Sequence, residues 1–583
     1  MFMKAKQLVI AGLALAALVA CNKEKAVETP LMDGDAYINV KITYSDPVTK
    51  GTAANPPFYF GTAEEQAIDN AYFIFYYADG SFCQYVKKEK EKGELKFNPK
   101  VEDKETPENV EKLSDAVVVL RDLKSNLYPV YMAVILNSDN NWINTNIKDK
   151  SISEATSAVQ TAIATVGTNK QVDWSNFMMS SSSFNNGDAR TGYFCTKLTP
   201  TNFQESAEKA VESNNPVEAY VERLAAKVKV EFGTALQDGG KIGSFEIDGN
   251  ATDLFFRVTG WGLNATTKDS YCFKNINASW TDADLGFSWN DVPNFRSYWA
   301  QSTNYGTGDY PKTFNSSDGH YKDDANVTLN YITYNDLKVA INGNAYCREN
   351  TNTAEYMSKN LSSTATSVLL GAKIVDKDGN AVTLYNYNGK LYTEDHYKAA
   401  ALNDYEAKNT DKLIYKVTTE GNNTKYTQIG KADLKIEISA DGYAHVELID
   451  AANYCYGAAA TIKDNHTPVT SEEANKLLNG TEQYKYNTGC SFYRDGMMYY
   501  NIPIEHLRES DKTTENYQIQ EGDYGVVRNH YYIITITKIK NLGKAVNDPN
   551  EVIVPNDDDT KSYYVAAKIN VLSWKVVRQT VEL

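Results

Sequence analysis

The chain has 583 residues, a formal net charge of −16 and 41 tyrosines. So acidic a chain excludes nucleic acid and anionic membrane surfaces as partners. The length predicts two or more domains. Short runs of Val, Ile, Tyr and Thr between Asn, Asp and Gly predict that these domains are mainly β.

The first residues predict a lipoprotein signal peptide over residues 1–20. The apolar run "LVIAGLALAALVA" follows two lysines; it is too short to span a membrane but fits the core of a signal peptide. It ends directly before Cys21, as in a bacterial lipoprotein cleavage site, whereas an ordinary signal peptide with an accidental cysteine is the alternative. Acyl chains on Cys21 would anchor the chain to a membrane. No second apolar run of this length follows, so the rest is expected to be exported.

The segment "AYINVKITYSD", residues 36–46, predicts a strand with one apolar face. Ile38, Val40, Ile42 and Tyr44 alternate with polar residues, which is typical of a half-buried strand. The next segment, "PVTKGTAANPP", contains prolines and a glycine that exclude regular structure. Lys50 is therefore expected in an exposed loop.

The elements that follow predict a first domain of strands with two helices. "AYFIFYYADGSFCQYV" predicts a hairpin that turns at Asp79-Gly80, and "VYMAVILNS" predicts a buried strand. Residues 153–166 predict a helix that Gly167 ends, and "SAEKAVES" predicts a second, short helix. The break in "ESNNP" predicts a domain boundary near residues 214–222.

The second domain is expected to be mostly β. Its strands are predicted in "KVKV", "DLKVAINGNAYC", "SVLLGAKIVDKDGNAV", "GMMYYNIPIEHL" and "YGVVRNHYYIITITKIKNLG", with an isolated helix over residues 472–479. Residues 547–562 are acidic and bounded by proline, which predicts an exposed loop. The closing segment "KINVLSWKVVRQTVEL" predicts a strand almost to the last residue.

The search for catalytic motifs predicts that the protein is not an enzyme and has no cofactor or metal. The six histidines form no HxH or HExxH pair, and the sequence has no GxSxG elbow, P-loop or EF-hand spacing. Besides Cys21 there are six scattered cysteines without a CxxC motif, so disulfides and buried free thiols both remain open. These six are Cys83, Cys195, Cys272, Cys347, Cys455 and Cys490.

Several segments together resemble the Mfa-like fimbrillin family, the pilin subunits of the type V pili of Bacteroidales. They are "VERLAAKVKV", "FRSYWAQSTNY", "YCRENTN", "ATSVLLGAKI", "YYNIPIEHL", "VVRNHYYIITITKIKNLG" and "NVLSWKV". The resemblance implies two transthyretin-like, Greek-key β-sandwich domains, over residues 51–220 and 221–562, and export through the outer membrane as a lipoprotein. It also implies that a trypsin-like surface protease removes a propeptide, residues 21–50.

The resemblance further implies that a neighbouring subunit fills the vacated place with its C-terminal strand, residues 563–583, so that subunits polymerise into fimbriae that support adhesion and biofilm formation. The implied cut lies between Lys50 and Gly51, where lysine replaces the family's usual arginine. Implied partners are copies of the chain, other fimbrial subunits, the protease, and host or bacterial receptors. The displaced residues would be Ile38, Val40, Ile42 and Tyr44, and the donor residues Ile569, Val571, Leu572, Trp574, Val576 and Val577.

Within the donor segment the apolar residues switch from one face of the predicted strand to the other. The sequence therefore leaves open which half of the segment would enter the groove. Ile569 and Val571 share one parity, whereas Leu572, Trp574 and Val576 share the other. Either a bulge redirects the strand, or one half enters the groove and the other pairs within its own domain. The triplet Ile-Asn-Val at residues 38–40 recurs at residues 569–571.

Two alternatives to a shaft subunit remain. One is a surface-anchored lipoprotein that binds glycans or proteins, and the other is a tip or anchor subunit of the pilus. In a glycan-binding protein exposed aromatic residues would stack on sugars. In a pilin the tryptophans Trp261, Trp289, Trp299 and Trp574 are expected in cores and interfaces.

Overall fold

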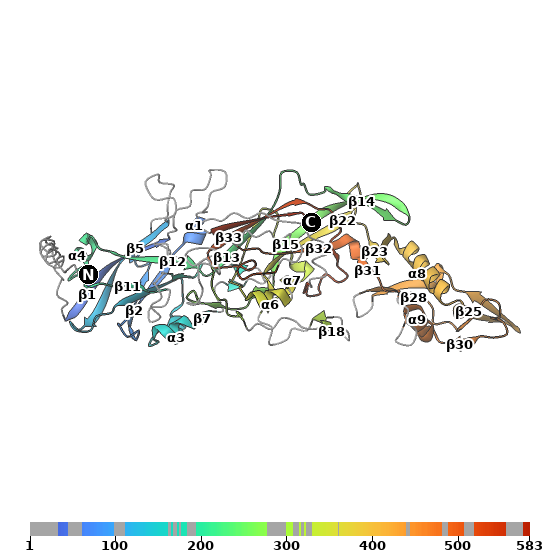
Figure 1. Cartoon of the computed structure of the whole chain (residues 1–583), viewed down its shortest axis with the longest axis horizontal. Helices are drawn as coiled ribbons and strands as arrows, with labels where there is room; N and C mark the ends of the chain where they lie inside the picture. The colour runs from blue at the N-terminus through green and yellow to red at the C-terminus, as the bar shows by residue number, and fades with distance from the viewer. Residues whose placement is uncertain are drawn as a thin grey trace, which may run out of the picture.

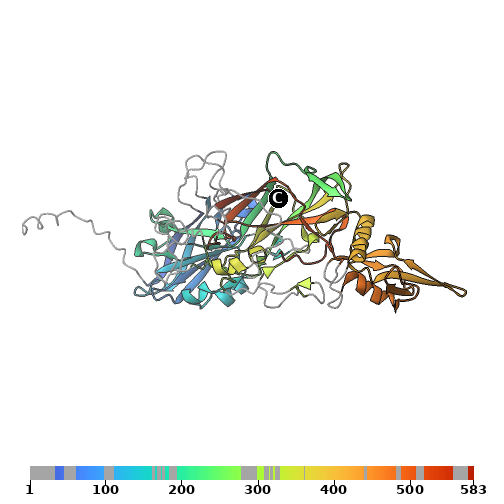
Figure 2. The same cartoon turned by 45° about the vertical axis from the view of Figure 1, so that its right-hand side comes forward.

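The computed structural model describes residues 33–44, 61–97, 111–160, 165–166, 172–173, 177–182, 194–276, 299–306, 314–315, 320–321, 329–359, 361–438, 443–480, 488–506, 518–555 and 575–582. Strands dominate these residues, and the longest described helix has 15 residues. The prediction of a mainly β chain with short helices is confirmed. The described elements form three parts in a row along the longest axis (Figures 1 and 2).

The first part is a nine-stranded sheet with the order β3-β2-β6-β10-β12-β1-β5-β4, in which β11 also pairs with β6. Strands β2 and β3 of this sheet form the hairpin that was predicted around the Asp79-Gly80 turn. The strands are β1 Gly34–Tyr44, β2 Asn70–Tyr76, β3 Phe82–Glu89, β4 Lys96–Phe97, β5 Glu111–Leu123, β6 Tyr131–Leu136, β10 Met179–Ser181, β11 Thr196–Lys197 and β12 Val217–Arg223.

Both faces of this sheet are covered at its centre. In β2, Phe73 belongs to the core cluster that contains Ile38 of β1. Ile74, its neighbour in sequence, points to the opposite face and packs in the cluster that contains Ile143 of helix α2, Asn140–Asn146. The continuous apolar run of this strand follows from burial on both faces.

The sheet also bends so that its edge strand β3 approaches β5. The side-chain amide of Gln84 donates to the carbonyl oxygen of Arg121 at 3.1 Å, and its oxygen accepts from the Arg121 N–H at 3.2 Å. The bend gives the first part a sandwich-like shape around its core.

The second part begins directly after β12, because the chain enters a new sheet between Arg223 and Ala226. One sheet has four strands in the order β21-β13-β33-β35, and the other has eight in the order β31-β23-β24-β14-β15-β22-β32-β34. Their bounds are β13 Ala226–Phe232, β14 Lys241–Ile247, β15 Asn250–Asn264, β21 Asn344–Cys347, β22 Ser367–Val375, β23 Leu384–Tyr387, β24 Lys390–Tyr392, β31 Ser491–Tyr493, β32 Met497–Pro503, β33 His530–Lys538, β34 Lys544–Ala545 and β35 Lys575–Glu582.

The two sheets of the second part share one core. Val228 of β13 and Ile534 of β33 lie in the same buried cluster as Phe256, Leu370 and Met498 of the larger sheet. The second part is therefore a β-sandwich whose two sheets pack face to face around this core.

The third part is inserted between two neighbouring strands of that larger sheet. Strand β22 pairs with β32, from Lys373 opposite Met497 onward, although residues 376–496 separate them in sequence. The inserted segment has its own core, built around Tyr397, Tyr405 and Leu477. Its elements are α8 Glu394–Lys408, β25 Leu413–Glu420, β26 Asn423–Gln428, β27 Leu434–Ile438, β28 Ala444–Leu448, β29 Tyr454–Gly457, β30 Thr467–Val469 and α9 Ser471–Asn479.

The helix predicted over residues 153–166 is wrong beyond its first turn. Helix α3 spans only Ile152–Thr156, where Ser151 and Glu154 form a capping box. The chain then forms β7, Val159–Gln160, which pairs with β17, Ser270–Tyr271. Pairing with a distant segment has overridden a helical pattern, whereas the short helices predicted near residues 206–213 and 472–479 are confirmed by α4 and α9.

The remaining described elements are short. They are α1 Ala63–Gln66, α4 Ala207–Glu212, α6 Ala354–Lys359, α7 Leu361–Thr364, β8 Thr165–Val166, β9 Val172–Asp173, β16 Thr266–Thr267, β18 Phe314–Asn315, β19 His320–Tyr321 and β20 Leu329–Asn330.

Candidate functional site

Strand β1 lies inside the first sheet and not at its edge. It pairs antiparallel with β5 along its length, and parallel with β12 from Val40 to Thr43. Ahead of β12, the Tyr37 N–H donates to the Gln204 carbonyl oxygen at 2.9 Å, and the Gln204 N–H donates back at 2.8 Å. Both edges of β1 are thus occupied by other strands or loops.

The inward side chains of β1 are part of the main core of the first part. Ala36 is 3% exposed, and Ile38 and Val40 are both 0% exposed. Tyr37 and Asn39, on the outer face, are half-buried. Burying Ile38 and Val40 stabilises the strand in its place by about 3–6 kcal/mol, at roughly 1.5–3 kcal/mol for each side chain.

Surface contacts add to the backbone pairing at the start of β1. The Ser125 N–H donates to Asp33 Oδ1 at 2.7 Å, which lowers the pKa of Asp33, and Arg121 forms an ion pair with Asp35. Exposed pairs of this kind contribute little to stability. The burial of two side chains and the backbone ladder therefore account for most of what holds β1.

The structure places only part of the predicted site. It describes Ile38 and Val40 fully, and the backbones but not the side chains of Ile42, Tyr44, Val576 and Val577. The others lie outside the described residues, namely Cys21, Lys50, Gly51, Ile569, Val571, Leu572 and Trp574.

The last described strand, β35, pairs within its own chain. It runs parallel to β33, with Val576 opposite Tyr531 and Val577 opposite Tyr532, at the end of the four-stranded sheet. Of the two uses left open for the C-terminal segment, pairing of its last half with its own domain is the one that this backbone adopts. The place of the preceding half is not described.

A cluster of buried charges lies where β12 continues into β13. Lys227 Nζ is 2.8 Å from Glu65 Oε1, with the two side chains 1% and 2% exposed. The Tyr346 hydroxyl donates to the same carboxylate oxygen at 2.5 Å. Arg223 Nε donates to the Glu65 carbonyl oxygen at 2.8 Å, and its Nη1 donates to Asn529 Oδ1 at 3.2 Å.

The pKa of Glu65 lies below its ordinary value despite burial. Burial alone would raise this pKa, but the charges of Lys227 and Arg223, with the hydrogen bonds from Lys227 and Tyr346, outweigh that effect. Glu65 is therefore a carboxylate at neutral pH. It joins α1, in the first part, to β13 and β21, in the second part.

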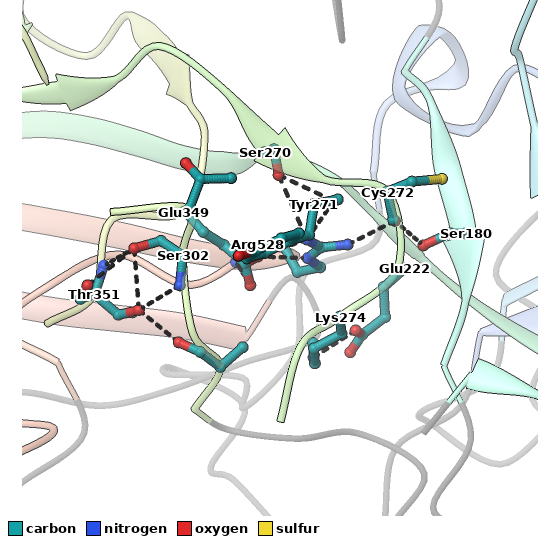
Figure 3. A network of polar contacts seen from close by, with 12 residues as sticks. Ser180, Glu222, Ser270, Tyr271, Cys272, Lys274, Ser302, Glu349, Thr351 and Arg528 are labelled. Carbon is teal, nitrogen blue, oxygen red and sulfur yellow. Dashed lines mark hydrogen bonds and ion pairs between the residues drawn. The ribbon is translucent and has the colours of Figure 1, made fainter. Parts of the chain in front are cut away.

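A second cluster of buried charges lies at the same junction (Figure 3). Arg528 donates to Glu349 Oε2 through Nε at 2.8 Å and through Nη2 at 2.6 Å, and to the Cys272 carbonyl oxygen at 3.0 Å. Beside it, Lys274 Nζ lies 2.5 Å from Glu222 of β12. The four charged side chains are between 0% and 3% exposed.

Sequence reasoning missed both junction clusters. Their signal is the charged triplet of "VERLAAKVKV", where Glu222, Arg223 and Lys227 interrupt an apolar pattern. A charge within such a run is read as solvent-facing, and its partners, Glu65 and Lys274, are distant in sequence. Only the fold brings these opposite charges together.

Five of the described cysteines, with Trp261 and Trp299, are buried in the structural core, whereas Trp289 lies outside the described residues. The six cysteines other than Cys21 are free thiols, five of them buried, and burial raises the pKa of Cys347 to about 12. Trp261 and Trp299 are 0% and 1% exposed, as expected for core residues. Neither indole is available to stack on a sugar. Among the described residues, no three His, Cys, Asp or Glu side chains gather as a metal site.

Within the described part of the chain, no helix combines the length and the apolar character needed to cross a membrane.

Comparison with known proteins finds a similarity in the C-terminal segment. Residues 491–580 match the family model described as "Major fimbrial subunit protein type IV, Fimbrillin, C-terminal". These residues include β31, β32 and β33 and most of β35. No curated protein matches the chain.

Two solved structures show a distant likeness over most of the chain. A fimbrilin from Porphyromonas gingivalis W83 is 14% identical, with 94% of this chain and 97% of that one covered and a TM-score of 0.33. A putative cell adhesion protein from Parabacteroides distasonis ATCC 8503 is 11% identical, with 94% and 99% covered and a TM-score of 0.30. TM-scores this low establish no common arrangement. Residues 491–580 are therefore similar to the C-terminal part of the major fimbrial subunit proteins that this family model describes.

Proposed function

We propose that the protein is a structural, non-enzymatic subunit of cell-surface fimbriae, and that it polymerises when a strand of a second copy replaces β1. The observation that carries this proposal is the interior position of β1. Its removal would leave the facing edges of β5 and of residues 217–220 of β12 unpaired and would empty the places of Ile38 and Val40 in the core. Such a groove accepts an extended segment through backbone hydrogen bonds and through sites for alternate side chains.

Release of β1 requires that the chain be cut. While β1 is tethered to its own sheet, its effective concentration is on the order of millimolar or higher. A donor strand at micromolar concentration is about a thousandfold less concentrated than the tethered β1. This difference favours β1 by roughly 4 kcal/mol. We propose that a trypsin-like surface protease cuts between Lys50 and Gly51 and thereby removes this advantage.

The segment before β35 is the half of the C-terminal region that fills the groove in this proposal. Residues 36–40 read Ala-Tyr-Ile-Asn-Val, and residues 567–571 read Ala-Lys-Ile-Asn-Val. In β1 the first, third and fifth of these positions point into the core. The same spacing in residues 567–571 would return an alanine, an isoleucine and a valine to those positions, while β35 remains on β33.

Export and adhesion complete the proposal. The precursor reaches the surface through the outer membrane as a lipoprotein acylated on Cys21, and cleavage releases it from this anchor. The assembled fimbriae then support adhesion to host or bacterial receptors and biofilm formation. A shaft position suits a chain that has both a replaceable strand and a donor segment, whereas a tip or anchor subunit needs only one of them.

The first test is the N-terminus of the protein in material sheared from cells. Mass spectrometry should find a mature start at Gly51 in the high-mass assemblies, and a lipid-modified start at Cys21 only in cell-bound precursor. A start at Cys21 throughout the assemblies would mean that β1 never leaves, and strand exchange would be wrong.

A further inference from the structure

We propose that the two buried charge clusters at the junction keep the groove folded after β1 has left and before a donor strand has arrived. This inference rests on the proposed function, because it concerns the same groove and a second copy of the chain as its partner. Glu65 and Glu222 are positioning residues for strand uptake: they touch neither β1 nor, in the proposed complex, the donor.

Strand β12 forms one wall of the groove, and its two halves pair with different strands. Residues 217–220 pair with β1, whereas residues 221–223 pair with β10, through Val221 opposite Ser181 and Arg223 opposite Met179. Loss of β1 removes the ladder of the first half alone. The second half keeps its short partner β10, and that half is where Glu222 and Arg223 enter the two clusters.

The two clusters hold the end of β12 from opposite sides. Glu222 pairs with Lys274, and next to them the Ser180 hydroxyl of β10 donates to the Cys272 carbonyl oxygen at 2.7 Å (Figure 3). Because side chains alternate along a strand, Arg223 points the other way, towards Glu65. The end of β12 is therefore fixed by contacts that do not involve β1.

The same cluster fixes the chain downstream of the proposed cut. Helix α1 begins after Thr62, whose N–H donates to Glu65 Oε2 at 2.8 Å in a capping box. Just before it, a Cβ atom placed on Gly61 would lie 2.6 Å from Arg223 Nη2, so the backbone packs tightly against the cluster. Residues from Gly61 onward are thus held at the junction, and the proposed cut would separate them from the residues up to Lys50.

Charge pairs suit this role because each member depends on the other. Removing one partner of a buried pair leaves an uncompensated charge, which strongly destabilises the site. An apolar side chain, in contrast, does not need one particular partner. The geometry of Glu65, which binds Lys227, Tyr346 and Thr62 at once, fixes α1 in a single place.

The test compares strand uptake with stability. Full-length Glu65→Gln and Glu222→Gln variants are cut after Lys50, β1 is separated under mild denaturant, and a labelled peptide of residues 563–583 is added. We expect the uncut variants to be folded, and peptide uptake after cutting to be at least about tenfold slower than in the wild type, since each change removes a charge-assisted contact. Glu64→Gln, which changes an exposed carboxylate on the same helix as Glu65, should match the wild type.

Uptake by Glu65→Gln and Glu222→Gln at the wild-type rate would overturn the inference. If either variant fails to fold uncut, Tyr346→Phe replaces it, because this change removes one bond to Glu65 and leaves its charge paired. It should slow uptake by a few fold.

Failure of the wild type to take up the peptide would count against the proposed function and not against the clusters. In that case amide hydrogen exchange in the cut protein decides. Residues 62–66 and 221–223 should remain protected in the wild type after β1 has left and lose protection in Glu65→Gln. Equal loss of protection in both proteins would overturn the inference.

Discussion

At the scale of single residues, strand exchange predicts that substitutions of Ile38 and of Ile569 affect the stability of different species, the precursor and the fibre. Ile38 is fully buried in the precursor, so Ile38→Ala should lower its free energy of unfolding by about 2–5 kcal/mol. Since β1 would be absent from the mature fibre, the same change should leave the denaturation of purified fibres unaltered. Ile569→Ala should show the opposite pattern, weakening fibres and sparing the precursor. Urea denaturation of both species measures these effects.

The half-buried outer residue Asn39 provides the control for this comparison, since Asn39→Ala should change the precursor much less than Ile38→Ala. A fibre weakened by Ile38→Ala would show that β1 stays in its own sheet.

The junction should also respond to acid through Glu65. Its pKa is lowered in the folded state from an ordinary value of 4.5, so its contribution to stability is present above pH 4.5 and is lost as pH falls through the folded pKa. The difference in urea midpoint between the wild type and Glu65→Gln should therefore be constant from pH 7 to about pH 5 and shrink below pH 4.5. A difference that grew towards low pH would contradict this sign. Glu218→Gln, on the surface of β12, should give a smaller difference throughout.

The sequence predicted correctly which side chains are buried where the alternation along a single strand decides this. Alternation in β1 identified Ile38 and Val40 as inward residues because a strand has a period of two. It failed for Glu222 and Lys227, whose burial depends on partners that the chain brings from far away. Spacing along the sequence carries no information on such partners.

At the scale of elements, strands were easier to predict than helices. The strands β1, β2, β6, β22, β32 and β33 follow from runs of β-branched and aromatic residues. Helix α8 was missed, although Thr393 and two acidic residues precede an alanine-rich stretch that favours a helix. The third part as a whole was missed because its boundaries carry no break in composition. What marks it as an insertion is the pairing of β22 with β32.

The third part is joined to the second by a contact at the start of α8. Asp248, in the turn between β14 and β15, accepts from the Thr393 N–H at 3.0 Å and from its hydroxyl at 2.7 Å. Asp248→Ala removes both acceptors and should destabilise the start of α8 by about 0.5–2 kcal/mol, as loss of a helix cap does. Amide exchange over residues 394–398 should become faster. Asp248→Asn, which tolerates the positive φ of 53° and keeps one acceptor, should have a smaller effect. Unchanged amide hydrogen exchange in Asp248→Ala would show that this contact does not stabilise the start of α8.

At the scale of the whole molecule, the C-terminal segment should be dispensable for folding of the monomer but required for assembly. A chain that ends at residue 564 lacks the proposed donor and β35, which lies at the edge of its sheet. Size-exclusion chromatography and electron microscopy should show folded monomers that do not join fibres, even after cleavage at Lys50. Polymerisation of the truncated chain would show that this segment is not the donor. A chain that ends after residue 574 keeps residues 567–571 and is the matched comparison.

The mixed pairing of β1 has a consequence for how a fibre would grow. Because β1 is antiparallel to β5 and parallel to β12, a replacement strand can enter in one direction only if it is to remake the same hydrogen bonds. The contact between copies is then heterologous, with groove and donor on different parts of each subunit, and such contacts generate an open filament wherever the rotation between copies does not close a ring. Every filament would carry an empty groove at one end and an unused donor at the other. Its two ends would therefore be chemically distinct, and a cell could start, cap or anchor each of them with a different protein.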